Sequence, residues 1–374
     1  MATEYRINMK RYNGTDYDIM YPRTLIEQVA DGQKQIIVDI VSLGTSWTGT
    51  GPYTQVVTID GIESDSKIDI QPDTYVINKL MESGTTALYI VNDGGVATAV
   101  ALGAAPNVAL EIQCTITKTA APPPPVISSV LNENNWNTIK WASKHNVGQN
   151  YWSVGDCKQI TMNGKVSDGL TLSDYTTWVY IIGFNHNSEK EGNGITFQGF
   201  KVTDNGTPVC LTDSAYNSNK ASGIWFNMNN AQTNAGGWEA CLMRKNIMPL
   251  IKAAFPSDLR AVIKTSTIFT APGNGNIELT ATQDDVFLLA EYEVSGTRYS
   301  ASNQESSYLK QYSYYSAGNS KLKYKHNATS DAAIWWRRSP SSNSSNEFCC
   351  INTNGGSSVN YAALSIGVSP CFKV

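Results

Sequence analysis

The side chains best suited to contacting a ligand are concentrated near the C-terminal end of this sequence. Six serines and five asparagines lie between Ser341 and Tyr361. Short hydroxyl and amide side chains, with Tyr and Gly, make adaptable contacts at low entropic cost and are favoured in antibody paratopes. So polar a tract cannot fold on its own burial, because it holds too little apolar area to offset chain entropy. It needs a scaffold to hold it.

Large apolar residues on both sides of the polar tract predict that scaffold. Ser341–Asn346 is typical of a surface loop, and Asn352–Gly356 is typical of a hairpin turn. A functional interpretation requires these same loops to form a binding face. The expected core positions are Trp335, Trp336, Phe348, Ile351, Val359, Val368 and Phe372.

Patterns that would indicate catalysis are weak. Cys349 and Cys350 are adjacent, so along a strand they should point to opposite faces, one buried and one exposed, which is poor geometry for a cooperating pair. The pairs Glu291/Glu293 and Asp284/Asp285 are interpreted as solvated strand edges and turns. His186 is expected to be a loop residue rather than a base, because no nucleophile motif accompanies it. We expect no catalytic residue.

Metal-binding patterns are equally weak. The three histidines, His145, His186 and His326, lack metal-site spacing. The polar tract contains only Glu347 as a carboxylate, too little charge for a tight calcium site. The sequence therefore predicts no metal, no cofactor and a calcium-independent surface. The seven cysteines show no Cys-x-x-Cys spacing and are expected to be buried free thiols.

The composition excludes some partners. Among 374 residues 16% are charged, 41% are hydrophobic, and 19 are Tyr, which favours a rigid β-rich surface protein over a metabolic enzyme. The formal net charge is −4 without a basic run, so nothing attracts nucleic acid. No apolar segment approaches the ~20 residues that span a bilayer, and the N-terminus lacks an apolar secretory signal. We expect assembly in a reducing cytosol.

Three short motifs carry a family resemblance. They are Trp335-Trp336-x-Arg338-Ser339-Pro340, then Phe348-Cys349, then Gly367-Val368-x-Pro370-x-Phe372. Together they resemble the C-terminal signature of a domain common in gut bacteria and their phages. That domain is related to the C-type-lectin-like fold of formylglycine-generating enzymes and of variable proteins diversified by retroelements, whose known type is the phage major tropism determinant. The resemblance covers roughly residues 151–374.

The resemblance implies a variable region at about residues 335–374, in which a fixed scaffold displays diversified side chains. Arg337 and Ser369 depart from the family pattern, as varied positions would. The implied scaffold residues are Trp335, Trp336, Arg338, Phe348, Val368, Pro370 and Phe372. The candidate ligand contacts are Arg337, Ser342, Asn343, Ser344, Asn346, Asn352, Asn354, Ser357, Asn360, Tyr361 and Ser369.

The elements that must position these residues predict a mostly β fold with a few helices, of α+β class. We expect a β-rich N-terminal attachment domain at 1–119, a polyproline linker at 120–125 and a ligand-binding domain at 126–374. Asn92–Gly95 predicts a hairpin turn, and Asp73 an N-cap of a helix that stops at Gly84.

Other elements are expected nearer the C-terminus. An amphipathic helix should begin at Gly237, kink or split at Pro249 and end at Pro256. Val286–Ala290 predicts a buried strand. The Tyr-rich stretch Tyr299–Tyr315 could pack beside the terminal face.

Segments near the N-terminus, Tyr12–Thr15 and Tyr21–Thr24, followed by Ser46-Trp47 and Gly51–Thr54, resemble attachment segments of phage tail-fibre proteins. These resemblances together imply a phage tail-fibre receptor-binding protein: a homotrimer assembled in the bacterial cytoplasm and located in the virion. It would contact tail or baseplate proteins through its N-terminal domain and a host-surface protein or glycan through its C-terminal domain. The alternative is a bacterial or prophage-encoded surface adhesin with a fixed ligand. A formylglycine-generating type of enzyme is the third possibility.

Overall fold

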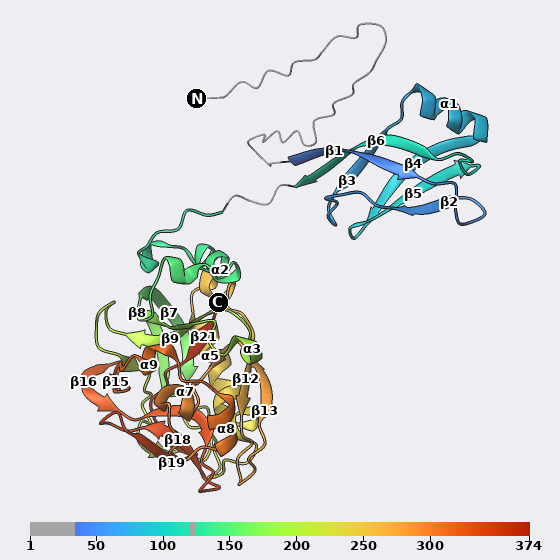
Figure 1. Ribbon diagram of the computed structural model, residues 1–374. Helices are drawn as coiled ribbons and strands as arrows, with labels where there is room; N and C mark the ends of the chain where they lie inside the picture. The colour runs from blue at the N-terminus through green and yellow to red at the C-terminus, as the bar shows by residue number, and fades with distance from the viewer. Residues whose placement is uncertain (1–33, 120–123) are drawn as a thin grey trace, which may run out of the picture. The chain divides into compact units, whose positions relative to one another are not determined.

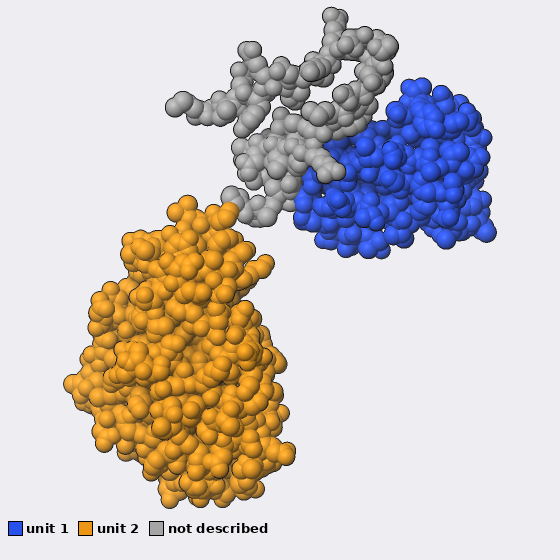
Figure 2. All heavy atoms as spheres, in the orientation of Figure 1, with its two compact units in different colours: residues 1–123 blue, residues 124–374 orange. Residues whose placement is uncertain are grey.

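The computed structural model describes residues 34–119 and 124–374, which belong to two compact units, 1–123 and 124–374 (Figure 1, Figure 2). The fold is mostly β with a few helices. The boundary between the units falls within the proline run Pro122–Pro125. The expected attachment segments Tyr12–Thr15 and Tyr21–Thr24 lie outside the described residues. Within the described ranges, no helix has the length and apolar character needed to cross a membrane.

The described part of unit 1, residues 34–119, contains two three-stranded antiparallel sheets and one helix. Alternate residues of one central strand, Ile112, Cys114 and Ile116, are buried in a core shared with Ala99 of the other sheet. Side chains alternate between the two faces of a strand, so each sheet keeps one face outside this core. The first sheet has the order β1 (Lys34–Leu43), β6 (Leu110–Thr119), β3 (Lys67–Gln71); the second has β2 (Tyr53–Val57), β5 (Val96–Gly103), β4 (Thr85–Asp93).

Two local predictions in unit 1 are confirmed. The Asn92–Gly95 turn connects β4 to β5, and its glycines adopt positive φ. Helix α1 (Thr74–Ser83) begins after Asp73, whose carboxylate accepts a hydrogen bond from the Val76 amide at 2.8 Å. It ends at Gly84, which has φ 79°, a conformation open to glycine without strain.

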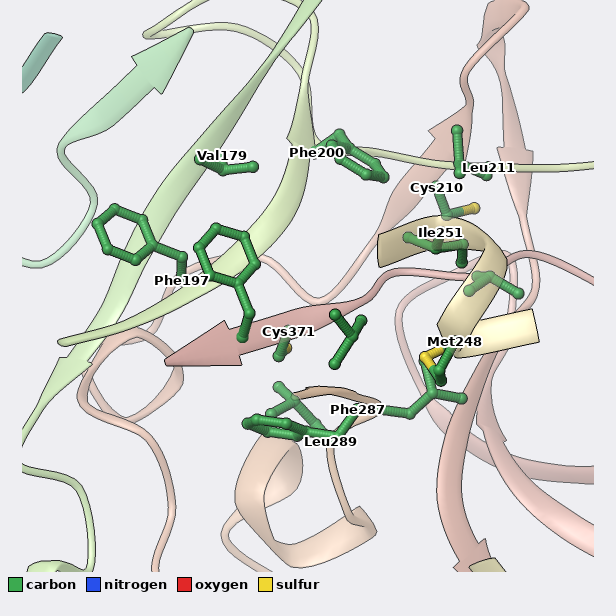
Figure 3. Close-up of a cluster of buried hydrophobic side chains, with 14 of the residues drawn as sticks. Val179, Phe197, Phe200, Cys210, Leu211, Met248, Ile251, Phe287, Leu289 and Cys371 are labelled. Atoms are coloured by element: carbon green, nitrogen blue, oxygen red, sulfur yellow. The ribbon is translucent and has the colours of Figure 1, made fainter. Parts of the chain in front are cut away.

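Unit 2 is built on a five-stranded antiparallel sheet whose interior includes the C-terminal strand. Phe372 on that strand stacks on Phe197 with ring centroids 5.4 Å apart, and the rings of Trp136 and Phe255 meet Phe372 edge-on. Figure 3 shows Phe197, Cys371 and Phe287 gathered around this strand. The strand order is β14 (Val286–Phe287), β21 (Cys371–Lys373), β9 (Ile195–Lys201), β8 (Leu170–Phe184), β7 (Cys157–Ser167).

A second sheet of unit 2 carries the polar tract. Its antiparallel order is β17 (Trp335–Pro340), β18 (Glu347–Ile351), β19 (Ser357–Tyr361). All six residues of β17 are buried. The indole N–H of Trp335 donates to the Lys321 carbonyl at 2.9 Å, and that of Trp336 donates to the Phe226 carbonyl at 2.8 Å. The predicted core positions Trp335, Trp336, Phe348, Ile351, Val368 and Phe372 are all buried, whereas Val359 is half-buried.

Short elements complete unit 2. Its helices are α2 (Trp136–Lys144), α3 (Ser188–Glu191), α4 (Gly237–Ala240), a π-helix (Met243–Ile247), α5 (Met248–Ala254), α6 (Ser257–Arg260), α7 (Glu291–Ser295), α8 (Asn303–Tyr308) and α9 (Ser313–Ser316), with 3-10 turns at Leu131–Glu133 and Gly148–Asn150. One small sheet has the order β10 (Val209–Cys210), β15 (Lys323–Lys325), β16 (Ala328–Ala333). Two further sheets are strand pairs: β11 (Ser218–Asn219) with β20 (Leu364–Ser365), and β12 (Ser266–Thr270) with β13 (Thr280–Asp284).

The expected strand Val286–Ala290 is wrong beyond Phe287. The chain turns there into α7, where the carboxylate of Glu293 accepts the Ala290 amide at 2.8 Å. Glu291 and Glu293, expected at solvated edges, are 0% and 1% exposed. Two buried carboxylates require cationic partners. The spacing of charged residues in the sequence does not show which cations these partners are.

Two further expectations need adjustment. The helix from Gly237 is divided into α4, a π-helix and α5, with Pro249 in the first turn of α5, where its missing N–H is tolerated; the chain leaves α5 before Pro256, as predicted. Both Cys349 and Cys350 are 0% exposed, so the expectation of one exposed thiol is wrong. Both faces of β18 are covered by other parts of unit 2. All seven cysteines are free and buried, as predicted.

Replacing Trp336 by Ala should destabilise unit 2 by about 3–5 kcal/mol, because a fully buried indole and its hydrogen bond to Phe226 are lost. The measurement is denaturant unfolding of the fragment 124–374. Tyr299→Ala is the control, since this ring is 58% exposed and its loss should change stability by less than about 0.5 kcal/mol. Equal stabilities of the two variants would contradict the scaffold role of Trp336.

Candidate ligand-binding site

Arg337, expected to contact ligand, is instead fully buried on β17. Its guanidinium pairs with Glu291 at 3.0 Å and donates to the Cys350 carbonyl at 2.8 Å and the Ser295 hydroxyl at 2.9 Å. The other oxygen of Glu291 accepts backbone amides of residues 299, 300 and 301 at 2.7–2.9 Å. Arg337 is therefore a structural link between β17, α7 and the stretch that follows α7.

Arg338, expected to be scaffold, is also fully buried and forms a bidentate pair with Glu293, with both N–O distances 2.6 Å. It also donates to the Leu288 carbonyl at 2.8 Å and to the Thr270 hydroxyl at 3.0 Å. Burial acts to raise the pKa of Glu293, but the Arg338 charge and hydrogen bonds outweigh it and lower that pKa. The pair is therefore ionised at neutral pH and holds α7 and β12 against β17.

The loop 341–346 is held from below by Asn234, a residue that the sequence analysis missed. Its side-chain amide donates to the carbonyls of Ser341, Ser344 and Glu347 at 3.0, 2.7 and 2.9 Å. Its backbone amide donates to the Ser345 carbonyl at 2.8 Å. Asn234 is 0% exposed. A single asparagine in a polar stretch gives no sequence signal of this role.

The Tyr-rich stretch packs beside the same loop, as expected. The Ser342 amide and hydroxyl both donate to the Ser300 carbonyl, at 2.7 and 2.9 Å. The hydroxyls of Ser300 and Ser341 lie 2.8 Å apart. Since Glu291 fixes residues 299–301, the loop is tied to the buried arginine on β17. Tyr299 projects beside it, 58% exposed.

The remaining candidate ligand-contact residues lie at the two ends of the β17-β18-β19 sheet, called the terminal sheet below. Loop 341–346 precedes β18, whereas turn 352–356 follows it, and Glu347 and Ile351 are four residues apart along the strand. At ~3.4 Å per residue the two ends are about 14 Å apart. The loop-end group contains Ser342, Asn343, Ser344, Asn346, Asn360 and Tyr361; the turn-end group contains Asn352, Asn354 and Ser357.

The loop-end group has the more accessible side chains for a ligand. Asn343 is exposed, Ser344 and Asn346 are half-buried, and Tyr361 is 49% exposed next to Glu347 in the neighbouring strand. In the turn-end group, Asn352 accepts the Gly356 amide at 2.8 Å, which shapes its own turn. The hairpin turn predicted at 352–356 is confirmed.

Two predicted contact residues are corrected. Arg337 is occupied by the pair with Glu291, as described above. Ser369 is 0% exposed, and its hydroxyl donates to the Gly199 carbonyl within the core. Both lie on segments that pack into the interior of unit 2, so neither can touch a ligand on the surface. Arg337 and Ser369 depart from the family pattern, but this departure did not mean that their side chains are exposed.

The two adjacent thiols are surrounded by protein. Burial raises the pKa of Cys349 well above its usual range and that of Cys350 to about 11. At neutral pH both thiols are therefore protonated. The Asn360 amide lies 3.4 Å from the Cys350 sulfur. Both cysteines contribute to the packing of unit 2.

A cavity of about 820 Å³ opens elsewhere on unit 2, beside α5. Its lining includes Arg244, Lys252, Asp284 and Asp285, which pair with one another at 2.6 Å: Arg244 with Asp284 and Lys252 with Asp285. The expectation of solvated turns fails for Asp284, which is 6% exposed and also accepts the Trp238 indole N–H at 3.0 Å. None of the predicted contact residues lines this cavity.

Comparison with known proteins gives one match. Residues 211–374 match a family described as a domain of unknown function (DUF6273). No curated protein and no solved structure matches the chain. The matched segment contains Asn234, α7 and the whole terminal sheet, so the buried arginines, their glutamate partners and the loop-end group all belong to it.

Replacing Asn234 by Ala should cost about 2–4 kcal/mol, because the carbonyls of Ser341, Ser344 and Glu347 lose the hydrogen bonds from its buried amide. The loop should also loosen, so the amides of Ser341 and Ser342 should exchange with deuterium faster. Hydrogen exchange read by mass spectrometry measures this. Asn343→Ala, an exposed change in the same loop, is the control, and unchanged exchange in the Asn234 variant would contradict its anchoring role.

Proposed function

We propose that this chain is a phage tail-fibre receptor-binding protein whose unit 2 binds a host-surface ligand through the loop-end group. The observation that carries the proposal is a rigidly mounted loop of short polar side chains. Asn343 and its neighbours project from a loop anchored to buried Asn234 and, through Ser300, to buried Glu291. A preorganised loop binds without a large ordering cost.

The chemistry of this surface fits recognition of a protein or glycan. Asn and Ser supply adaptable hydrogen bonds, while Tyr361 and Tyr299 supply apolar area on either side of the loop. Glu347, half-buried at the base of the loop, is the carboxylate of the polar tract. Calcium is not required by this set of side chains.

A C-type-lectin-like fold for unit 2 is part of the proposal. Its support is that the residues of the family resemblance fill the interior: Trp335, Trp336 and Phe372 are buried, and Arg338 is paired. Substitution at loop-end positions, which are exposed or half-buried, would leave this interior intact. Diversification there, at Ser342, Asn343, Ser344, Asn346, Asn360 and Tyr361, would change the ligand without changing the fold.

We also propose that chains associate with one another through unit 1. The outer face of the β2-β5-β4 sheet exposes Val56 (73%), Tyr89 (44%), Val91 (43%) and Leu102 (37%). Across residues 54–56, 98–102 and 87–91 this face has no charged side chain. The outer face of the other sheet also exposes Ile36, Val38 and Ile40, but it carries charges as well, such as Lys67 and Asp69. Uncharged apolar faces of this kind mark protein interfaces, and a homotrimer would bring several weak sites together.

Tyr361→Ala should weaken binding of the labelled full-length protein to host bacteria by roughly 5–30-fold, because an exposed aromatic anchor of the loop-end group is lost. Asn354→Ala, at the other end of the sheet, should leave binding unchanged. Both are measured with and without a calcium chelator, which should not alter the result. Equal loss in both variants, or binding that calcium restores, would contradict the proposed face.

The full-length chain should be a trimer by light scattering at micromolar concentration. Val56→Asp should lower its mass toward that of a monomer, because a buried unpaired carboxylate in the apolar face is costly. Val38→Asp, on the outer face of the charged sheet, is the control and should leave the trimer intact. A monomeric wild-type chain would contradict the trimer and favour the single-chain adhesin.

A further inference from the structure

Three buried side chains from distant parts of unit 2 meet in its interior. His186 lies in the turn after β8, Glu191 at the end of α3, and Glu293 in α7. They are 7%, 4% and 1% exposed. One potential ligand atom from each lies within 4.8 Å of the other two. The loop-end group includes none of the three, so the cluster is separate from the proposed binding face.

Two atoms of this cluster lack hydrogen-bond partners among the described residues. They are Nε2 of His186 and Oε2 of Glu191. Oε1 of Glu191 accepts the Asn187 amide at 3.0 Å, which orients the carboxylate. Oε1 of Glu293 accepts one hydrogen bond, from Arg338, and keeps a second lone pair, whereas Oε2 accepts both Arg338 and the Ala290 amide. Buried polar atoms are nearly always satisfied, so unpaired ones facing each other point to a bound species.

We propose that this cluster binds a divalent transition-metal ion of the Zn²⁺ class, through His186 Nε2, Glu191 Oε2 and Oε1 of Glu293. His nitrogen and Glu oxygen are both zinc ligands, and zinc sites that keep a water molecule in the fourth position have three protein ligands. The sequence does not show this site, because its ligands come from segments that only the fold brings together.

The protonation states suit metal binding. Burial lowers the pKa of His186 to about 4, so the imidazole is neutral at physiological pH and a ring nitrogen can offer a lone pair. Burial also raises the pKa of Glu191 to about 7. A cation beside this carboxylate would stabilise its ionised form and offset the cost of burial.

Nearby positive charges decide which metal is favoured. Arg338 already pairs with Glu293, and the ammonium of Lys373 lies 4.0 Å from Oε2 of Glu191, close enough for an ion pair but too far for a hydrogen bond. These cations offset the carboxylate charge that Ca²⁺ or Mg²⁺ would need, and both prefer an all-oxygen shell. A borderline-soft ion gains most of its binding from the neutral imidazole. We therefore expect Zn²⁺ to bind and Ca²⁺ not to bind.

Polar groups next to the cluster could hold the water ligand. The ring of Tyr312 stacks on His186 with centroids 3.5 Å apart, which fixes the imidazole plane. The hydroxyls of Tyr312 and Thr196 are also buried without partners. Thr196 lies opposite Lys373 on the adjacent strand. A metal-bound water would give these hydroxyls the partners that they lack.

The test is the metal content of full-length protein expressed with added Zn²⁺ and passed through a desalting column. We expect about one zinc per chain by elemental analysis. X-ray absorption should show nitrogen and oxygen neighbours at about 2.0–2.2 Å and no sulfur at about 2.3 Å, which excludes binding by the cysteines. His186→Gln should lose the zinc, while His326→Gln, a histidine outside this cluster, should retain it.

Three results would overturn the proposal: wild-type protein without stoichiometric zinc, zinc retained by His186→Gln, or a sulfur-containing shell. The first would mean that the unpaired atoms bind water alone. Because the wild-type measurement is decisive by itself, misfolding of the variant cannot obscure the answer. Expression with added Ca²⁺ is a further arm, and stoichiometric calcium in place of zinc would also contradict the proposed ligand chemistry.

Discussion

Two adjacent buried ion pairs hold the β17-β18-β19 sheet of unit 2 to α7. Arg337 and Arg338 are neighbours on β17, so they point to opposite faces, and each meets a glutamate of α7. Glu291 and Glu293 are two residues apart on a helix, separated by about 200° around its axis, which matches this divergence. Removing one member of such a pair leaves an uncompensated buried charge and typically costs about 3–5 kcal/mol. The terminal sheet and α7 are therefore one structural unit.

The same ion pairs also determine the position of the loop that carries the exposed side chain of Asn343. Glu291 fixes residues 299–301 through three amides, and Ser300 in turn contacts the loop that carries Asn343. Asn234 holds the loop from the other side. A short polar loop gains no stability from its own burial, so these hydrogen bonds, rather than a hydrophobic core, hold it in place. Exposed positions can then vary at little cost, whereas their supports cannot.

Buried polar groups in unit 2 fall into two kinds. Some are fully paired, like Arg338 with Glu293, and stabilise the fold. Others, such as His186 and Glu191, retain unpaired atoms. The distinction matters because an unpaired buried atom costs free energy that a bound ion or water can recover. The proposed metal site therefore concerns the stability of the interior, independently of ligand binding at the loop.

Local patterns determined much of the fold: the mostly β class, the Asn92–Gly95 turn, the capped helix after Asp73 and the buried indoles of Trp335 and Trp336. These follow from neighbouring residues alone. Sequence did not determine the partners of charged groups, so Arg337 was expected at the surface and Glu291 in solvent. It also could not show that β18 separates the loop-end group from the turn-end group, or that Asn234 anchors the loop. Only the tertiary structure decided these points, because burial and pairing depend on residues far apart in the chain.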